Sequence, residues 1–284
     1  MLTIKEIDHT IHLALVEDAH DMDITTNFLI LPSSISEAYI VSKEPGILCG
    51  IDIVKRLFKK LDKNMHFKTS FKDGDALKPC DKVLEIKGKT RAILTGERTA
   101  LNFLSYLSGV ATNTNNYVKA VKPYKAQILS TRKTTPGLRN FDKYAVRCGG
   151  GINHRKNLKE MILIKDNHRE IYHGNILLAE AILKFQKSHN EPICVEVDTL
   201  AEFKQVLPTQ PTIILLDNMS CSQMKQAVRI RDKFNKYKLP LLEASGGVTL
   251  KTIRKIAQTG VDRISIGALT HTHKALNLSM EVVR

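Results

Sequence analysis

Short apolar segments alternate with amphipathic helical patterns after residue 121, and this alternation limits the folds open to the chain. The apolar segments cover 128–129, 161–164, 193–197, 213–216, 241–242 and 264–266, and helical patterns cover 177–185, 200–207, 224–234 and 250–257. Apolar strands joined by helices predict a parallel sheet with both faces covered. Because this region has no central Gly-x-Gly-x-x-Gly fingerprint, we expect an incomplete barrel of about six strands rather than a dinucleotide-binding sheet.

The first part of the chain has a different pattern. Apolar spacing predicts helices over 4–16 and 51–61 and a longer buried helix from Thr95 over about 16 residues. Alternating apolar and polar residues predict strands over 38–42, 67–71 and 82–87. We therefore expect an α+β region with short antiparallel strands before the barrel.

Polar and charged residues stand at the end of each apolar segment of the second half. In an α/β barrel the carboxyl ends of the strands face one mouth, where active sites lie. A strand that is simply buried needs no lysine or glutamate at its end, so the repetition predicts an active site. The strand ends read Thr131-Arg132-Lys133, Lys165-Asp166, Glu196-Val197-Asp198, Asp217-Asn218, Glu243-Ala244-Ser245-Gly246-Gly247 and Ser265-Ile266-Gly267.

Basic residues dominate residues 131–169, which contain ten Lys or Arg and only three acids. Arginine binds planar carboxylates with two parallel hydrogen bonds, and lysine supplies a point charge. This composition suits a ligand with more than one carboxylate or phosphate, although an ordinary surface or a nucleic-acid patch would also be basic. The candidate cations are Arg132, Lys133, His154, Arg155 and Lys165.

Two further groups complete the candidate site. Glu196 and Asp217 could form ion pairs with the cations, or they could hold Mg²⁺ together with substrate phosphates. Glycine lets backbone N–H groups approach a phosphate, and Thr249 is a fair N-cap for a following helix whose start would add to that cradle. The candidate phosphate-binding residues are Ser245, Gly246, Gly247, Ser265 and Gly267.

Composition narrows the function classes. The formal net charge of +14 raises nucleic-acid binding, but aromatic residues are 6% of the chain and do not interleave with basic ones. Apolar runs are shorter than the ~20 residues of a membrane helix, and acids interrupt the N-terminal 18 residues, so we expect a cytoplasmic protein without a signal peptide. The five cysteines show no CxxC spacing, which argues against a zinc site or a disulfide framework.

The sequence resembles the quinolinate phosphoribosyltransferases, also called nicotinate-nucleotide pyrophosphorylases (carboxylating), nearly from end to end. The motifs that carry the resemblance are DITT at 23–26, GERTALNFLSYLSG at 96–109, STRKTTPGLR at 130–139, KYAVRCGGGINHR at 143–155, LIKDNH at 163–168, EVDT at 196–199, LLDN at 215–218, EASGG at 243–247 and SIGALTH at 265–271.

The resemblance implies an architecture. Residues 1–110, with 272–284, would form an N-terminal α/β sandwich domain, and residues 111–271 an incomplete α/β barrel. It also implies a homodimer, or a higher oligomer built from it, in which the N-terminal domain of one subunit covers the barrel mouth of the other. Arg98 would then reach the partner's active site.

The resemblance also implies a reaction: quinolinate and phosphoribosyl pyrophosphate (PRPP), with Mg²⁺, give nicotinate mononucleotide, pyrophosphate and CO₂. Arg98, Arg132, His154, Arg155 and Lys165 match positions that hold the quinolinate carboxylates. Lys133 matches a position near the pyrophosphate and the quinolinate, with Thr131 beside it, and Glu196 and Asp217 match positions at the ribose hydroxyls and Mg²⁺. The 5′-phosphate would meet Ser245, Gly246, Gly247, Ser265 and Gly267, with His271 close by.

Two alternatives compete with this prediction. A paralogous phosphoribosyltransferase of the same fold, such as those associated with molybdate genes, would lack the quinolinate-specific cations, all of which are present here. A basic RNA- or DNA-binding module would show steep salt dependence without turnover.

Overall fold

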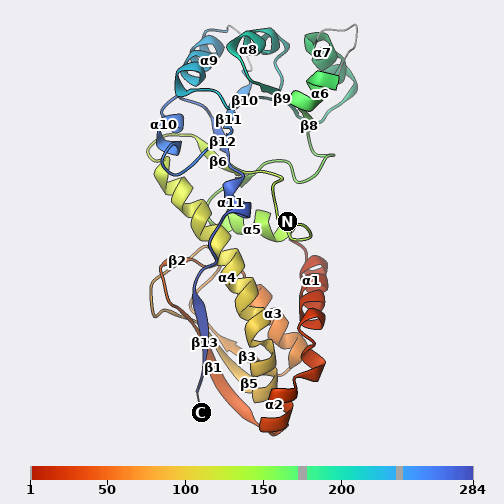
Figure 1. The fold of residues 1–284 in the computed structure, drawn as a ribbon, viewed down its shortest axis with the longest axis vertical. Coiled ribbons are helices and arrows are strands. Elements are labelled where there is room, and N and C mark those ends of the chain that lie inside the picture. Colours follow the sequence, from red (N-terminus) through yellow and green to blue (C-terminus); the bar gives the residue numbers. More distant parts are fainter. Residues whose placement is uncertain (1, 172–177, 235–238, 284) are drawn as a thin grey trace. The chain divides into compact units, whose positions relative to one another are not determined.

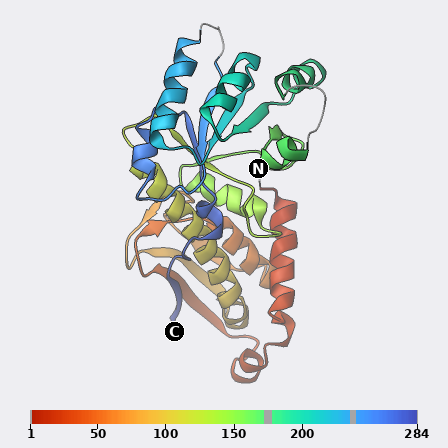
Figure 2. The same cartoon turned by 45° about the horizontal axis from the view of Figure 1, so that its top comes forward.

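The computed structural model describes residues 2–171, 178–234 and 239–283, which form two compact units. The first unit contains residues 1–115, 140–150 and 272–284, and the second contains residues 116–139 and 151–271. Figures 1 and 2 show the course of the chain through both units. In the described residues, no helix is both long and apolar enough to cross a membrane.

The first unit is built on a four-stranded antiparallel sheet with the order β13-β1-β5-β3. Helices α3 and α4 lie along this sheet (Figures 1 and 2). A Cβ at Gly96 of α4 would lie 2.7 Å from side-chain atoms of Leu61 and Phe58 of α3, so the two helices pack closely. The elements are α1 (Ile4–Glu17), α2 (Ile24–Leu29), β1 (Ile35–Ser42), β2 (Gly46–Ile47), α3 (Ile51–Leu61), β3 (His66–Lys68), β4 (Ala76–Leu77), β5 (Lys82–Lys89), α4 (Thr90–Ala120, first unit up to Asn115), α5 (Arg139–Cys148) and β13 (Leu278–Val283).

The second unit is a seven-stranded parallel sheet with the order β7-β6-β12-β11-β10-β9-β8. Helices α7 to α10 surround one side of it (Figures 1 and 2). The curved sheet is open between β7 and β8 and confirms the expected incomplete barrel. Its elements are β6 (Gln127–Ser130), β7 (Ile152–Asn153), β8 (Ile162–Ile164), α6 (Asp166–Ile171), α7 (Leu178–Ser188), β9 (Ile193–Val197), α8 (Leu200–Val206), β10 (Ile213–Asp217), α9 (Cys221–Lys233), β11 (Leu241–Ser245), α10 (Ile253–Ala257), β12 (Arg263–Ser265) and α11 (Ala268–His271).

The predicted helices over 4–16 and 51–61 are confirmed by α1 and α3, and all six predicted apolar segments contain strands. In and next to the basic segment, the structure adds a seventh strand, β7, and the helices α5 and α6, for which the sequence pattern predicted no element. The N-cap expected at Thr249 is wrong: the chain first makes a turn, and α10 begins at Ile253 after Thr252. The predicted start of a helix at Leu177 lies outside the described residues.

The C-terminal segment is held in the first unit by backbone contacts. Strand β13 pairs with β1, and the Leu276 N–H donates to the Ser105 carbonyl of α4 at 2.9 Å. Gly109, on the same helix, faces the backbone of Lys274 and Ala275, because a Cβ there would collide with the Lys274 carbonyl oxygen. A glycine is therefore required at this crossing of two backbone segments.

Gly109→Ala should lower the free energy of unfolding by about 1–3 kcal/mol, which urea denaturation would measure. Replacing glycine by alanine inside a helix normally stabilises it by about 1 kcal/mol, so the sign of the change identifies the backbone contact. Asn102→Ala, at an exposed position of the same helix, should be neutral or mildly stabilising. A stabilising Gly109→Ala would contradict the contact with residues 274–275.

Candidate active site

The strands of the second unit place their polar residues on one face of the sheet. Parallel pairing sets Glu196, Leu215, Glu243 and Arg263 at one level across β9 to β12. Side chains two apart on a strand share a face, so Asp217, Ser245 and Ser265 continue the same row toward the carboxyl ends. The alternate residues of these strands are apolar and buried. This alternation lets one sheet combine a packed core with a row of polar groups.

The predicted site residues of the second unit all lie at the carboxyl ends of its strands. Thr131, Arg132 and Lys133 follow β6, His154 and Arg155 follow β7, and Lys165 follows β8. Glu196 and Asp217 are the penultimate and last residues of β9 and β10. Ser245 and Ser265 are the last residues of β11 and β12. Gly246 and Gly247 follow β11, Gly267 follows β12, and His271 ends α11. Arg98 is exposed on α4 of the first unit.

One pocket, of about 450 Å³, joins the glycine-bearing ends to Lys133 and Asp217. Gly246 has a φ of +89°, and a Cβ there would collide with the Asn218 side chain, so no other residue fits. The Asn218 N–H donates to the Ser245 carbonyl at 3.0 Å, and its side-chain amide donates to Asp217 Oδ2 at 2.7 Å. The strand-end loops thus fix the Asp217 carboxylate at the edge of a pocket with a backbone lining, as a phosphate-binding site requires.

Lys133 is placed in this pocket by contacts to its backbone. Its N–H donates to Thr131 Oγ1 at 3.0 Å, and its carbonyl accepts from Thr270 Oγ1 at 2.6 Å. The side-chain Cδ lies 2.9 Å from the position of a Cβ on Gly267, so any larger residue there would displace the lysine. The exposed ammonium group is free to approach an anion at the pocket mouth.

Arg155 is a partly buried cation near a second cation. Burial, and next the charge of Arg132, lower the pKa of its guanidinium. Arginine remains protonated all the same, so two like charges are held together. Its Nη1 donates to the Met161 carbonyl at 3.0 Å, which orients the guanidinium. Such a pair of arginines is most stable with an anion between them.

Acidic oxygens from three residues gather beside the cations. One carboxylate oxygen of each of Glu196, Asp198 and Asp217 lies within 4.8 Å of the others. Burial raises the pKa of Glu196, and the neighbouring charges of Asp217, Asp166 and Asp198 add to the rise, while a hydrogen bond from the Asp166 N–H opposes it. Carboxylate oxygens are the ligands that Mg²⁺ prefers, so this acidic cluster fits that ion. Asp198 was not among the predicted metal ligands.

Glu243 is a residue of this site to which the sequence assigned no role. It is fully buried, and its carboxylate lies 3.6 Å from His154 Nε2 and 3.1 Å from Arg263 Nε. The Arg155 N–H donates to His154 Nδ1 at 2.9 Å, which orients the imidazole with Nε2 toward Glu243. A glutamate in the otherwise apolar strand Leu241–Ser245 is the signal that could have revealed it. A buried carboxylate needs such partners.

The chain is similar to known proteins over nearly its whole length. The family model for the quinolinate phosphoribosyl transferase N-terminal domain matches residues 23–108, and the model for the C-terminal domain matches residues 110–281. A probable nicotinate-nucleotide pyrophosphorylase [carboxylating] of Synechocystis sp. is 39% identical over 98% of this chain and 93% of its own length. The corresponding Mycobacterium leprae protein is 38% identical over 96% of each chain. The solved structure of NadC from Streptococcus pyogenes has a TM-score of 0.93 and 38% identity, covering 100% of this chain and 98% of its own.

Glu196→Gln should raise the free energy of unfolding at pH 7. Folding raises the pKa of the Glu196 carboxyl, so the native state binds its proton more tightly than the unfolded state does. As pH rises from the ordinary pKa to the raised one, the unfolded state loses this proton first, and the free energy of unfolding falls. The gain should therefore disappear as pH falls toward 4. Denaturant unfolding at several pH values would measure it, with the exposed Glu191→Gln as a control that changes little. A loss of stability at pH 7 would contradict the unfavourable effect of burial and neighbouring acids on the ionised Glu196 carboxylate.

Proposed function

The chain belongs to the quinolinate phosphoribosyltransferase family, and we propose that it transfers the phosphoribosyl group of PRPP to quinolinate with loss of CO₂, giving nicotinate mononucleotide and pyrophosphate. It is thus a pentosyltransferase of NAD biosynthesis, and a cytoplasmic location is part of the same proposal. The observation that carries it is the meeting of three groups at one sheet edge. Two arginines suit a ligand with two carboxylates, and the acidic cluster suits a positively charged ribosyl centre and a metal ion. The glycine-lined pocket suits a phosphate.

The cations that follow β6, β7 and β8 bind quinolinate. Arg132 and Arg155 lie close enough for their charges to oppose each other, and two carboxylates on adjacent ring carbons would relieve that repulsion. Lys165 follows β8, the strand at the other end of the open sheet, and adds a third charge. His154, held by Glu243 and the Arg155 N–H, supports the same half of the site.

The glycine-lined pocket, the acidic residues and Lys133 bind PRPP. The 5′-phosphate fits the pocket formed by Ser245, Gly246, Gly247, Ser265 and Gly267, with His271 at its wall. Glu196 and Asp217 face the ribose, and Lys133 takes the pyrophosphate. Mg²⁺, held at Glu196 and Asp217 with Asp198 beside them, supplies further positive charge for the pyrophosphate when it is bound.

Catalysis in this proposal is electrostatic. Lys133 stabilises the charge of the departing pyrophosphate, while Glu196 and Asp217 stabilise positive charge at the ribose C1 as its bond to pyrophosphate breaks. The quinolinate nitrogen, positioned by Arg132, Arg155 and Lys165, then attacks C1. Loss of the C2 carboxylate as CO₂ leaves an electron pair on C2, which the adjacent ring cation stabilises until a proton from solvent adds to C2. Fixed charges of this kind contribute several kcal/mol to lowering a barrier.

Arg98 belongs to a further part of the proposal, a homodimer with a shared site. It is exposed on α4, and the described part of the chain shows no hydrogen bond or ion pair for its guanidinium. We assign it to the quinolinate carboxylates of the partner subunit's barrel. A higher oligomer built from such dimers is compatible with this arrangement.

The purified chain, mixed with quinolinate, PRPP and Mg²⁺, should form nicotinate mononucleotide, which chromatography would quantify. Arg155→Ala should raise the KM for quinolinate by about ten- to a hundredfold, because a hydrogen bond to a charged group is worth about 1.5–3 kcal/mol, and leave the KM for PRPP nearly unchanged. Product formed from nicotinate or another base but not from quinolinate would contradict the assignment.

Mixing two inactive chains would test the shared site. Arg98→Ala removes the arginine donated to the partner, and Lys165→Ala removes a cation of the chain's own barrel. Heterodimers of the two should recover about a quarter to a half of wild-type activity, since one site in each is intact. The double variant Arg98→Ala/Lys165→Ala mixed with wild type is the control for subunit exchange. Absence of recovery in exchanged heterodimers would show that each site is built from one chain.

A further inference from the structure

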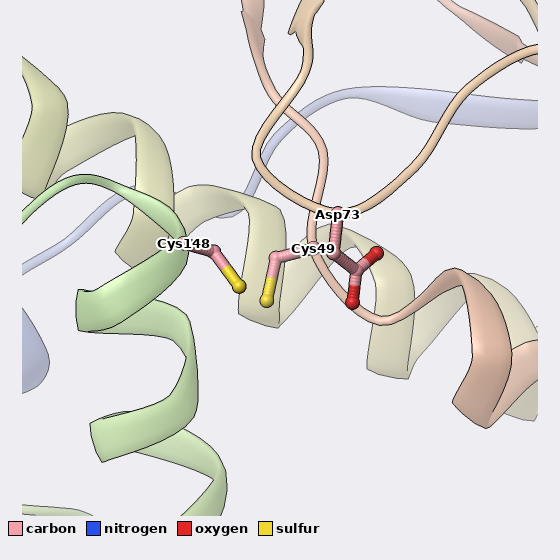
Figure 3. Close-up of side chains that lie close together, drawn as sticks. All are labelled: Cys49, Asp73 and Cys148. Carbon is pink, nitrogen blue, oxygen red and sulfur yellow. The ribbon is translucent and has the colours of Figure 1, made fainter.

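Two cysteines and an aspartate converge in the first unit, separate from the residues of the proposed reaction. Cys49 lies in the loop before α3, Asp73 between β3 and β4, and Cys148 at the end of α5. Both sulfur atoms and one carboxylate oxygen lie within 4.8 Å of one another. In Figure 3 the two thiols point toward each other, with the Asp73 carboxylate beside Cys49. Metal-ligand atoms from three distant segments thus share one small volume.

Asp73 is fixed by three hydrogen bonds. Its Oδ1 accepts from the Ile51 N–H at 3.0 Å, and its Oδ2 accepts from the Gly50 N–H at 2.9 Å and from the Tyr144 hydroxyl at 2.6 Å. It therefore caps the start of α3 and orients Tyr144 on α5. An ionised carboxylate has about four acceptor positions, so one position, on Oδ1, remains for a further partner. Metal-binding carboxylates are typically oriented by hydrogen bonds of this kind.

The backbone at both cysteines is also fixed by contacts with α4. The Cys49 N–H donates to Ser108 Oγ at 2.9 Å, and that hydroxyl is placed to donate to the Cys49 carbonyl at 3.3 Å. Cys148 lies one helical turn after Tyr144, on the same face of α5. Gly149 follows in direct contact with α4, because a Cβ there would collide with the Ala111 carbonyl. The backbone at both cysteines is therefore fixed against α4.

The chemistry of the three groups favours a cation. Cys49 is fully buried, and Cys148 is partly buried beside it. The Asp73 carboxylate lies next to both sulfur atoms. A disulfide would need no carboxylate beside it, and Asp73 would slow the thiolate attack that forms one. A divalent cation would be stabilised by all three groups.

We propose that Cys49, Asp73 and Cys148 form a Zn²⁺ site, with water as the fourth ligand. Zinc lies about 2.3 Å from sulfur and is tetrahedral, which separates two sulfur ligands by about 3.8 Å and is compatible with the observed cluster. Thiolates select zinc over Mg²⁺, so the site differs in kind from the all-oxygen cluster of the second unit. Binding replaces two thiol protons, which pass to solvent, and joins residues 49, 73 and 148 through one ion.

The test uses the reduced full-length chain, freed of metal by a chelator and kept in excess Mg²⁺ so that the carboxylate site is filled. One equivalent of Co²⁺, a spectroscopic substitute for zinc, should give a thiolate-to-cobalt charge-transfer absorption that one equivalent of Zn²⁺ abolishes. In weakly buffered solution, Zn²⁺ should release close to two protons per chain. Zn²⁺ should also raise the melting temperature.

Cys148→Ser should lose the charge-transfer absorption or reduce it by about half, and Cys49→Ser/Cys148→Ser should lose it entirely. Cys80→Ser, which changes an exposed cysteine, is the matched control and should behave as the wild type. Circular dichroism would establish that each variant is folded, and proton release by the wild type requires no variant. Absence of the absorption in the wild type, its retention in the double variant, or a Cys49–Cys148 disulfide formed on mild oxidation by a chain that binds no Co²⁺ would each overturn the proposal.

Discussion

The parallel hydrogen-bond register of β9 to β12 is the constraint on which the rest of the second unit depends. It sets Glu196, Glu243 and Arg263 at one level, and the two-residue repeat of each strand brings Asp217 and Ser245 to the same face. A slip of one residue in any strand would exchange this polar row for buried apolar side chains. The apolar residues that face the helices therefore determine, through the register, where the charges of the site lie.

Through Glu243, the strand register also affects a loop outside the sheet. The buried Glu243 carboxylate would be costly alone, and burial indeed raises its pKa while Arg263 lowers it. The partnership with Arg263 follows directly from the strand pairing, and the approach to His154 connects the sheet to the loop after β7. Glu243 thereby links His154, in the cationic half of the site, to Arg263 of β12. Replacing it would alter the position of His154 before any substrate binds.

Sequence periodicity predicted the strongly patterned elements well, and the reasons for the exceptions are local. The stripe of α3 is unambiguous, so its predicted bounds, 51–61, agree with the structure. Helix α5 is rich in basic residues and follows a glycine turn, and β7 has two residues, so neither carries a readable period. Thr249 has the right residue type for a cap, but its hydrogen bonds with Thr252 form a turn instead.

The candidate site could be assembled from the sequence because each of its parts follows a strand, and strand ends are visible as transitions from apolar to polar residues. Contacts between distant segments are not visible in that way. Asp198 follows Glu196 by two residues and was still not assigned to the metal, and Cys49 and Cys148 meet because α5 is part of the first unit although it lies far along the chain. Spacing rules for cysteine detect sites within one segment, whereas this cluster draws on three.

A crystal structure of the chain with quinolinate bound would test most directly whether the strand ends form one dicarboxylate site. The two carboxylates should lie within hydrogen-bond distance of Arg132, Arg155 and Lys165, with the ring nitrogen directed toward the pocket lined by Ser245 and Gly246. Quinolinate bound elsewhere, or carboxylates seated in the glycine-lined pocket with the arginines unengaged, would contradict this account.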